Sequence, residues 1–402
     1  MYKRYLLMIM LAVSFSCQGV TEDNSRAGKS AKNRSLSCGA EQTGHYVDIL
    51  RNKTIGVVAN HTSRVGEVHL VDTLLDMGLD IRKIFAPEHG FRGTADAGEH
   101  VEDGKDDKTG LPIISLYGSN RKPTASQLNG LDIVLFDIQD VGARFYTYIS
   151  TLHYVMEACA ESDVSVMILD RPNPNIDVVD GPVLDTSYAS FVGMHPVPVA
   201  HGMTIAEYAR MINGEGWLKD GMKCDLSWVK CDNYSRKMTY SLPVAPSPNL
   251  PNQRSIRLYP SLCFFEATSL SVGRGTNMQF QIVGHPALEG KAEFSFMPAP
   301  NEGAAHPKHK NKTCYGYDLR QDSQRFGFEE GQLQIDWLLD IYRSFPKSET
   351  FFERPGFFDK LAGGNSLRMQ ILAGADAERI RNSWQDDLKE FKSMRKSYLI
   401  YQ

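Results

Sequence analysis

Residues 132–170 read DIVLFDIQDVGARFYTYISTLHYVMEACAESDVSVMILD, which is the pattern of a strand, a helix and a second strand. Asp132–Asp137 and Val164–Asp170 are short apolar runs, whereas Tyr148–Glu161 has apolar residues at helical spacing. Two apolar strands joined by a helix form a βαβ unit, in which the strands run parallel and are covered on both faces. The stretch therefore predicts an α/β fold.

The same alternation of strands and helices extends through the first half of the chain. We predict strands at Thr54–Asn60, Ile81–Ala86 and Pro112–Tyr117, and helices at His69–Leu79, Ala125–Asn129 and Ile205–Asn213. After about residue 240 the pattern changes, beginning with the extended, proline-rich segment Pro243–Pro251. There we predict strands at Phe264–Ser271, Gln279–Val283 and Ala292–Met297, and helices at Leu333–Phe345 and Ala375–Tyr398. A parallel-sheet domain at 41–257 and a smaller α+β domain at 258–402 are expected.

The composition excludes several classes of protein. Of 402 residues, 42% are hydrophobic and 23% charged, which is typical of a globular protein and not of a disordered or fibrous one. The formal net charge is −4, so no basic excess favours nucleic acid as a partner. Seven cysteines are too few for a disulfide scaffold.

The first residues have the pattern of an export signal. Lys3 and Arg4 precede the apolar run Tyr5–Phe15, which is too short to span a bilayer. Ser16 and Cys17 then resemble the site at which bacterial lipoproteins are acylated, so residues 1–17 are expected to be a signal peptide with Cys17 as the lipidated residue and membrane anchor. The alternative is ordinary cleavage, which would release a soluble periplasmic protein. Residues 18–40 are polar and are expected to form a tether.

Polar side chains follow each predicted strand of the first half. Ligands bind beyond the carboxyl ends of the strands in open parallel sheets, so these side chains are candidates for one polar cleft. They are Asn60, Glu88, His89, Arg92, Tyr117, Asp137, Gln139, Asp140, Arg144, Tyr146, Arg171 and Asn173. Each also has a structural interpretation, since a carboxylate can cap the next segment and an arginine can be a buried ion-pair partner. Their coincidence at strand ends favours a functional cleft.

Several chemistries lack their sequence motifs. Gly273–Thr276 is not a dinucleotide fingerprint, and no Walker A, G-x-S-x-G or H-E-x-x-H sequence occurs. His306 and His309 stand in the polar loop 301–312 and are expected to be a surface pair, so we expect neither a cofactor nor a metal. The remaining carboxylates and arginines suit hydrolysis of a glycosidic bond, for which two carboxylates suffice. Arginine also suits a substrate that carries a carboxylate.

Six stretches with uncommon residue combinations follow one another along the chain. They are APEHGFRG (86–93), LYG (116–118), FDIQDVGARFYTYISTL (136–152), LDRPNPN (169–175), HGMTIAEYA (201–209) and FEATSLSVGRGT (265–276). In these stretches the chain resembles the exo-β-N-acetylmuramidase family of NamZ-type glycosidases, from about residue 50 to its C-terminus. One departure is Ala267, where the family pattern leads us to expect glycine.

The resemblance implies a Rossmann-like first domain, a smaller second domain and an active site between them. It also implies release of N-acetylmuramic acid from the non-reducing end of peptidoglycan fragments, in cell-wall turnover. Glu88 is then the candidate general acid, and Glu266 or Asp140 the second catalytic carboxylate. The sugar's own N-acetyl group is an alternative nucleophile, which Glu266 or Asp140 would orient.

The resemblance also suggests residues that bind the substrate. Arg144, Arg171 or Arg274 is expected to bind the lactyl carboxylate, and Asn60, Tyr117, Tyr146 and Asn173 the hydroxyl or N-acetyl groups. His89, Arg92, Asp137 and Gln139 complete the candidate binding residues. Two other functions stay open from the sequence: a non-catalytic lipoprotein that binds wall fragments for uptake, and an amidase or esterase that acts on the same substrate.

Overall fold

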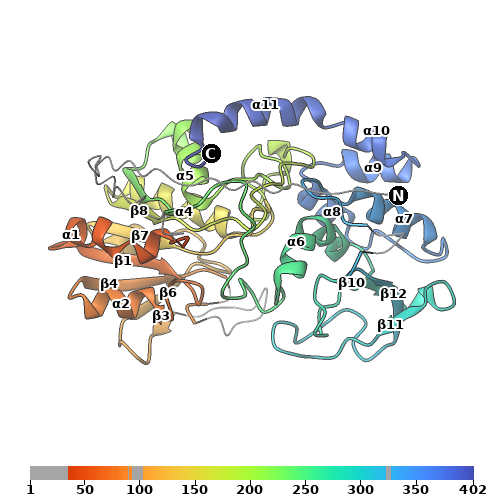
Figure 1. Ribbon diagram of the computed structural model, residues 1–402, viewed down its shortest axis with the longest axis horizontal. Coiled ribbons are helices and arrows are strands. Elements are labelled where there is room, and N and C mark those ends of the chain that lie inside the picture. Colours follow the sequence, from red (N-terminus) through yellow and green to blue (C-terminus); the bar gives the residue numbers. More distant parts are fainter. Residues whose placement is uncertain (1–34, 89, 93–102, 323–326) are drawn as a thin grey trace, which may run out of the picture. The chain divides into compact units, whose positions relative to one another are not determined.

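The first half of the chain is built on a seven-stranded sheet (Figure 1). In the computed structural model, which describes residues 35–88, 90–92, 103–322 and 327–402, the order across the sheet is β5-β6-β4-β1-β7-β8-β9. The strands are β5 (Gly104–Lys105), β6 (Pro112–Ser115), β4 (Asp80–Ala86), β1 (Thr54–Ala59), β7 (Ile133–Asp137), β8 (Ser165–Leu169) and β9 (Leu226–Val229). Neighbouring strands run parallel except β5, which is antiparallel to β6.

This strand order decides where a ligand can bind. Numbered along the chain, the parallel strands lie in the order 3-2-1-4-5-6, which is the doubly wound order of a Rossmann fold. Val57 at the centre pairs with Ile84 on one side and Leu135 on the other. The order reverses between β1 and β7, so a crevice is expected beyond the carboxyl ends of the strands there. The predicted α/β fold class is confirmed.

Helices cover both faces of the sheet because its strands are apolar on both sides. Val57 and Leu135 pack against α2 (Leu70–Asp76), whereas Val58 and Phe136 on the other face pack into the cluster that contains α4 (Tyr148–Glu161). The first half also contains α1 (Val47–Leu50), α3 (Ala125–Leu128), α5 (Ile205–Gly214) and the small hairpin β2 (Arg64–Val65) and β3 (Val68–His69).

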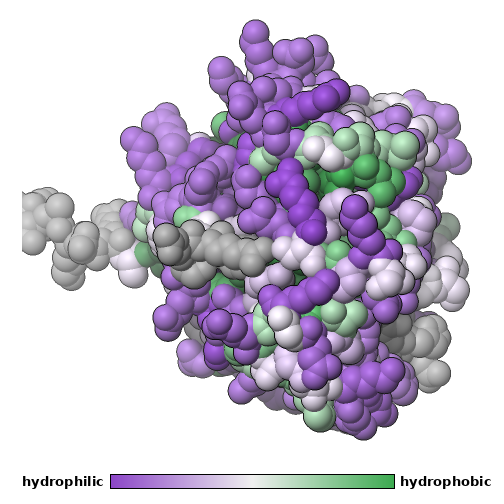
Figure 2. All heavy atoms as spheres, turned by 90° about the vertical axis from the view of Figure 1, so that its right-hand side faces the viewer, coloured by the Kyte–Doolittle hydropathy of each residue, from purple (hydrophilic) through white to green (hydrophobic). Residues whose placement is uncertain are grey.

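The second half begins with α6 (Gln253–Leu262) and has its own antiparallel sheet in the order β10-β12-β11. Its further elements are β10 (Ile282–His285), β11 (Phe294–Phe296), β12 (Cys314–Asp318), α7 (Ile335–Ser344), α8 (Pro355–Ala362), α9 (Ser366–Leu372), α10 (Ala377–Asn382) and α11 (Gln385–Arg395). On this side the surface is mainly hydrophilic (Figure 2). Among the described residues, no helix is long and apolar enough to cross a membrane.

The C-terminal segment returns to the first domain. Helix α11 extends from α10 toward α5 (Figure 1), and Tyr401 then donates a hydrogen bond of 2.6 Å to Asp170 at the end of β8. The backbone N–H of Ile400 donates to Glu207 at 2.9 Å. Since Asp170 and Glu207 are buried in the first domain, these bonds fasten the end of the chain to it.

Most predicted elements of the first half are present, whereas the second half differs more. The strand predicted at Phe264–Ser271 is wrong, because α6 continues directly into a 3₁₀ helix, η5 (Cys263–Ala267). Phe264 and Phe265 of this 3₁₀ helix are buried, and a run of buried aromatic residues is also typical of a β-strand. The helix predicted at Ala375–Tyr398 is divided into α10 and α11. Several elements were not predicted: α1, β2, β3, β5 and β9 in the first half, and α6, β12, α8 and α9 in the second.

Candidate active site

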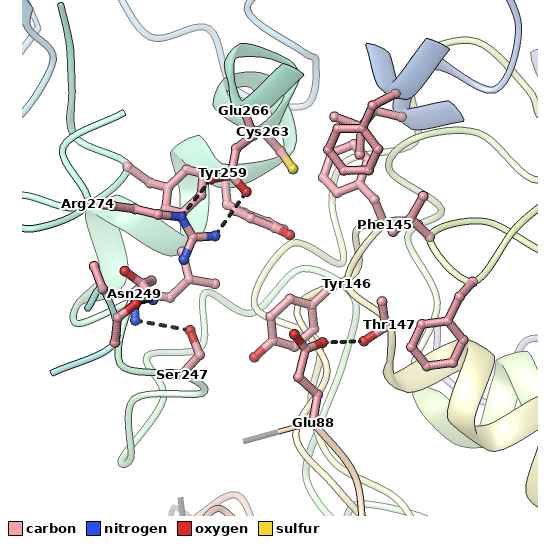
Figure 3. A pocket seen from close by; sticks show the side chains of 18 of the residues that line it. Glu88, Phe145, Tyr146, Thr147, Ser247, Asn249, Tyr259, Cys263, Glu266 and Arg274 are labelled. Atoms are coloured by element: carbon pink, nitrogen blue, oxygen red, sulfur yellow. Dashed lines mark hydrogen bonds and ion pairs between the residues drawn. The ribbon is translucent and has the colours of Figure 1, made fainter. Parts of the chain in front are cut away.

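A cavity of about 960 Å³ lies beyond the carboxyl ends of β4, β6 and β7. Segments of the second half form its opposite wall, so both halves of the chain contribute (Figure 3). From the first half come Glu88, Tyr117, Arg121, Phe145, Tyr146, Thr147, Phe191 and Val192. From the second half and the segment before it come Ser247, Asn249, Leu250, Tyr259, Cys263, Glu266, Arg274, Phe280, residues 303–308, Arg354, Phe357 and Leu361.

Glu88 enters the cavity from the tight turn that ends β4. The backbone N–H of Gly90 closes this turn by donating to Pro87 at 3.0 Å, and Gly90 has the positive φ of 75° that favours glycine. The Thr147 hydroxyl donates to Glu88 Oε2 at 2.8 Å (Figure 3). Burial and the hydrogen-bonded Glu88 carboxylate raise the pKa of Tyr117. Glu88 is half-buried. The hydroxyl groups of Thr147 and Tyr117 orient its carboxyl group.

A buried hydrogen-bond network supports the wall that holds Glu88. The Asn60 side chain at the end of β1 donates to the hydroxyl of Tyr148 at 2.9 Å and accepts from Thr62 at 2.6 Å. Tyr148 in turn donates to the backbone oxygen of Glu88 at 3.5 Å. The Tyr146 ring packs edge-on against Tyr148, with 4.9 Å between the ring centroids. The start of α4 is thereby tied to the turn that contains Glu88.

On the opposite wall, Glu266 is held in a bidentate ion pair with Arg274. Arg274 donates from Nε to Oε1 at 2.6 Å and from Nη2 to Oε2 at 2.9 Å (Figure 3). Both side chains are about a quarter exposed, at 23% and 24%. Burial alone raises the pKa of Glu266, but Arg274, with Lys308 and Arg354, outweighs it and lowers the pKa below its ordinary value. Glu266 is therefore ionised at neutral pH.

Positive groups gather around this ion pair. Lys308 and Arg354 both donate to the backbone oxygen of Glu266, at 3.1 and 2.6 Å. Across the cavity, the Arg121 guanidinium lies 4.4 Å from the ring centroid of Phe191. Among the described lining residues, four lysine and arginine side chains face two carboxylates, so the cavity favours an anionic ligand.

Aromatic rings and buried amides form the rest of the lining. Tyr259 packs edge-on against Phe145, Tyr146 and Phe280, with centroid distances of 5.4, 5.8 and 5.0 Å. The Asn249 side chain donates to the Gly303 carbonyl at 2.6 Å. Its buried Oδ1 accepts no hydrogen bond from the described part of the chain. Apolar rings beside a few polar atoms are typical of a small-ligand site.

Family models match the chain on both sides of this cavity. The model for the N-terminal domain of exo-β-N-acetylmuramidase NamZ matches residues 55–254, and the model for the C-terminal domain matches residues 257–401. The chain belongs to the NamZ family. The resemblance in the six sequence motifs is thereby confirmed.

Similarity to individual proteins supports the same family assignment. The chain is 39% identical over 400 residues to the peptidoglycan β-N-acetylmuramidase NamZ of Bacillus subtilis (strain 168), covering 93% of this chain and 95% of that one. A crystal structure of a DUF1343 family protein from Bacteroides fragilis NCTC 9343 has a TM-score of 0.84 and 45% identity, covering 92% of this chain and 99% of the other. A second one from the same strain has a TM-score of 0.77 and 27% identity, covering 91% and 99%.

The structure brings five of the candidate site residues to the cavity of this NamZ family member. They are Glu88, Tyr117, Tyr146, Glu266 and Arg274. Seven other candidates lie outside its lining and belong to the framework: Asn60, Arg92, Asp137, Gln139, Arg144, Arg171 and Asn173. Asp140 also lies outside the lining. His89 and Cys17 lie outside the described residues.

Two arginines proposed to bind the substrate's carboxylate are used by the fold instead. Arg144 is fully buried and donates to the carbonyls of Pro182, Val197 and Leu361 at 2.9, 2.6 and 2.9 Å. Arg171 forms a bidentate pair with Asp137, at 2.6 and 2.9 Å. Neither arginine lies in the cavity lining, and most of the guanidinium donors of Arg144 are bonded to backbone carbonyls, so the fold explains both residues without a ligand.

Asp140, the second candidate for the catalytic carboxylate, is also placed away from the cavity. It is 4% exposed and accepts a hydrogen bond of 2.6 Å from the backbone N–H of Gly142. Burial raises the pKa of Asp140 to about 7, although that hydrogen bond lowers it. The hydrogen bond from Gly142 places Asp140 within the loop after β7 and away from the cavity lining.

The other polar candidates serve the framework too. Gln139 donates to the backbone oxygens of Asp140 and Pro172 at 2.8 and 2.7 Å, and Asn173 donates to that of Met203 at 2.9 Å. Arg92 pairs with Asp106 at 2.9 and 2.8 Å. These bonds fix the loops at the carboxyl end of the sheet, behind the cavity lining.

Several lining residues were missed from the sequence. Thr147 lies within the motif at residues 136–152, but nothing in the sequence pattern distinguishes it from its neighbours. His306 and Lys308 belong to the polar loop 301–312, which was interpreted as a surface segment and instead covers the cavity. Arg121 and Arg354 are single charged residues in loops, so their position depends on tertiary structure alone.

The ion pair predicts a pH-dependent contribution to stability. Because the pKa of Glu266 is lower in the folded state, its contribution is present above the unfolded value of about 4.3 and is lost as pH falls through the folded value. We expect Glu266→Gln to lower the free energy of unfolding at pH 7, and the difference from wild type to shrink below about pH 4. Urea unfolding of both proteins at a series of pH values measures this difference in the free energy of unfolding. An equal difference at every pH would contradict the ion-pair account.

Proposed function

We propose that this chain is an exo-β-N-acetylmuramidase, a glycoside hydrolase that releases N-acetylmuramic acid from the non-reducing end of peptidoglycan fragments. The observation that supports this most is the pair of carboxylates in one cavity with different surroundings. Glu266 is paired with Arg274, whereas Glu88 is oriented by hydroxyl groups. Family membership of the whole chain supports the same reaction and substrate.

Glu88 is the general acid in this mechanism. The bond to be broken needs a proton on its leaving oxygen, and a carboxyl group supplies it in most glycosidases. Glu266 is kept ionised by Arg274 and cannot donate a proton at neutral pH. Among the described lining residues, Glu88 is the other carboxylic acid, and its turn at the end of β4 directs it into the cavity.

Glu266 is assigned to positioning and not to attack on the sugar. Both of its oxygens accept from Arg274, so nucleophilic attack would neutralise the carboxylate and weaken two charge-assisted hydrogen bonds. The described lining offers no third carboxylate. This favours the substrate's own N-acetyl oxygen, which attacks C1 while Glu88 protonates the leaving oxygen. Water then opens the cyclic intermediate and returns the proton to Glu88.

Replacement of Glu88 tests the assignment of the general acid. We expect Glu88→Gln to lower kcat on the disaccharide MurNAc-β-1,4-GlcNAc by at least about 100-fold, the usual contribution of general acid catalysis. Product release followed by mass spectrometry measures it. The exposed Glu67→Gln is the matched control and should keep wild-type turnover. Near-normal turnover by folded Glu88→Gln would remove Glu88 from the mechanism.

The wall around Arg274 is proposed to recognise the lactyl carboxylate that distinguishes muramic acid from glucosamine. Arg274 uses Nε and Nη2 for Glu266, and its Nη1 has no hydrogen-bond partner among the described residues. Lys308 and Arg354 add positive charge beside it. A carboxylate placed against this wall would gain charge-assisted hydrogen bonds that a neutral sugar cannot make.

A selectivity measurement tests this recognition. Wild type should strongly prefer a β-N-acetylmuraminide over the matching β-N-acetylglucosaminide. The double variant Glu266→Gln/Arg274→Met leaves no unpaired carboxylate and should lose about 10- to 100-fold in kcat/KM on the muraminide relative to Glu266→Gln alone, mainly through KM. Activity on the glucosaminide should not change. An equal loss on both substrates would mean that Arg274 does not recognise the lactyl group.

We also propose that the chain is exported and anchored to a membrane through an acylated Cys17. The apolar run Tyr5–Phe15 followed by Ser16 and Cys17 supports this. Labelled palmitate fed to cells should enter the wild-type protein and should not enter Cys17→Ser, which should leave the membrane fraction. Wild-type protein without label would contradict acylation.

A further inference from the structure

Two buried cysteines lie opposite each other where the chain enters the fold. Ser37 and Asp232 form an isolated antiparallel bridge and exchange both backbone hydrogen bonds, at 3.1 and 2.9 Å. In an antiparallel ladder the next pair along is then Cys38 and Cys231, at a non-hydrogen-bonded position. Cα atoms at such positions are about 4.5 Å apart, which lies within the range that a disulfide spans.

The backbone bonds of the two cysteines agree with this register. The N–H of Cys38 donates to the Glu41 carboxylate at 2.7 Å, and the N–H of Cys231 donates to the Tyr401 hydroxyl at 2.7 Å. Neither N–H bonds to the opposite cysteine, as expected of a non-hydrogen-bonded pair. Cys38 is also extended, with φ −69° and ψ 161°. The geometry therefore places the two side chains close together.

The two thiols are buried and chemically unequal. They are 5% and 3% exposed, with Cys38 Sγ lying 3.8 Å from the Tyr240 hydroxyl and Cys231 Sγ donating to the Asp170 carbonyl at 3.2 Å. The hydrogen bond from Cys231 and the positive charge of Arg171 outweigh burial and lower the pKa of the Cys38 thiol. Burial raises the pKa of the Cys231 thiol. Cys38 is thus the more readily ionised partner, which is the nucleophile in thiol–disulfide exchange.

Three of the other described cysteines also contact polar atoms, as Cys231 does. Cys224 Sγ lies 3.7 Å from the Asp225 carbonyl, and Cys314 Sγ lies 3.9 Å from that of Lys312. Cys263 hydrogen-bonds to Tyr259. Cys159 on α4 is buried, and its burial together with the nearby Cys224 raises the pKa of its thiol. Cys38 and Cys231 differ from these cysteines in that the backbone pairing of Ser37 with Asp232 places them opposite each other.

We propose that Cys38 and Cys231 form a disulfide. The link would enclose β1 to β9, that is the whole parallel sheet, and would fasten the first residues of the folded unit to the segment after β9. This inference does not depend on the glycosidase activity. It fits a chain exported to an oxidising compartment, where disulfides persist.

The reaction needs an oxidant of the disulfide class, either a small disulfide such as oxidised glutathione or a thiol oxidoreductase. The Cys38 thiolate attacks one sulfur of that disulfide and expels the other as a thiolate, which gives a mixed disulfide on Cys38. The Cys231 thiolate then attacks the Cys38 sulfur and expels the second thiolate. The protein loses two electrons and two protons, and the oxidant becomes two thiols.

Thiol trapping tests the proposal. The purified protein is equilibrated with oxidised glutathione, denatured with excess N-ethylmaleimide and mapped by peptide mass. We expect two unreactive thiols and one linked peptide pair that contains Cys38 and Cys231. Reduction should lower the Tm by about 5 °C. The control Cys159→Ser should behave like wild type, whereas Cys38→Ser should lack both the link and the shift in Tm.

Two results would overturn the proposal. One is complete alkylation of every thiol in the oxidised wild-type protein, and the other is a link between a different pair, such as Cys159 and Cys224. Because the peptide map of the wild-type protein decides this, the test holds even where Cys38→Ser fails to fold.

Discussion

The bidentate ion pair between Glu266 and Arg274 determines the charge state of the Glu266 carboxylate that lines the cavity. A carboxylate that accepts both hydrogen bonds from one guanidinium is held ionised, and its oxygens are no longer available for proton transfer. In the proposed mechanism the acid role therefore falls to Glu88 on the opposite wall. The same contact fixes the Arg274 side chain, so that its remaining donor and the nearby Lys308 and Arg354 form a positive wall for an anionic sugar.

The rest of the fold keeps the two walls in place. On the first wall, the Asn60 and Tyr148 side chains connect the end of β1 to the turn with Glu88. Between the halves, the buried Arg144 bonds to carbonyls of the first domain and to that of Leu361 in α8. Buried arginines paired with carbonyls or with Asp137 thus give the site its rigidity, and they are separate from the arginine that faces the ligand.

The sheet, and the position of Glu88 at the cavity, could be predicted because both follow from the pattern of the strands. Apolar runs of β-branched residues specify parallel strands, and the strand-end position of Glu88 follows from the topology. Sequence pattern cannot separate an arginine that binds ligand from one that binds carbonyls, since both follow strands in polar motifs. Arg144 and Arg274 differ only in the neighbours that the tertiary fold supplies. The second half was harder, because buried Phe264 and Phe265 suit a strand and a 3₁₀ helix equally.

The division of labour between the two glutamates is tested most directly by the leaving group. An aryl β-N-acetylmuraminide with a strongly acidic phenol needs no proton on its leaving oxygen, whereas the natural disaccharide does. The account predicts that Glu88→Gln recovers most of the rate of its first step on the activated aryl substrate, and that Glu266→Gln shows the same relative loss on both substrates. If the rate of Glu88→Gln stayed equally low on both, or if Glu266→Gln were the variant that recovered, the assignment of the general acid would be contradicted.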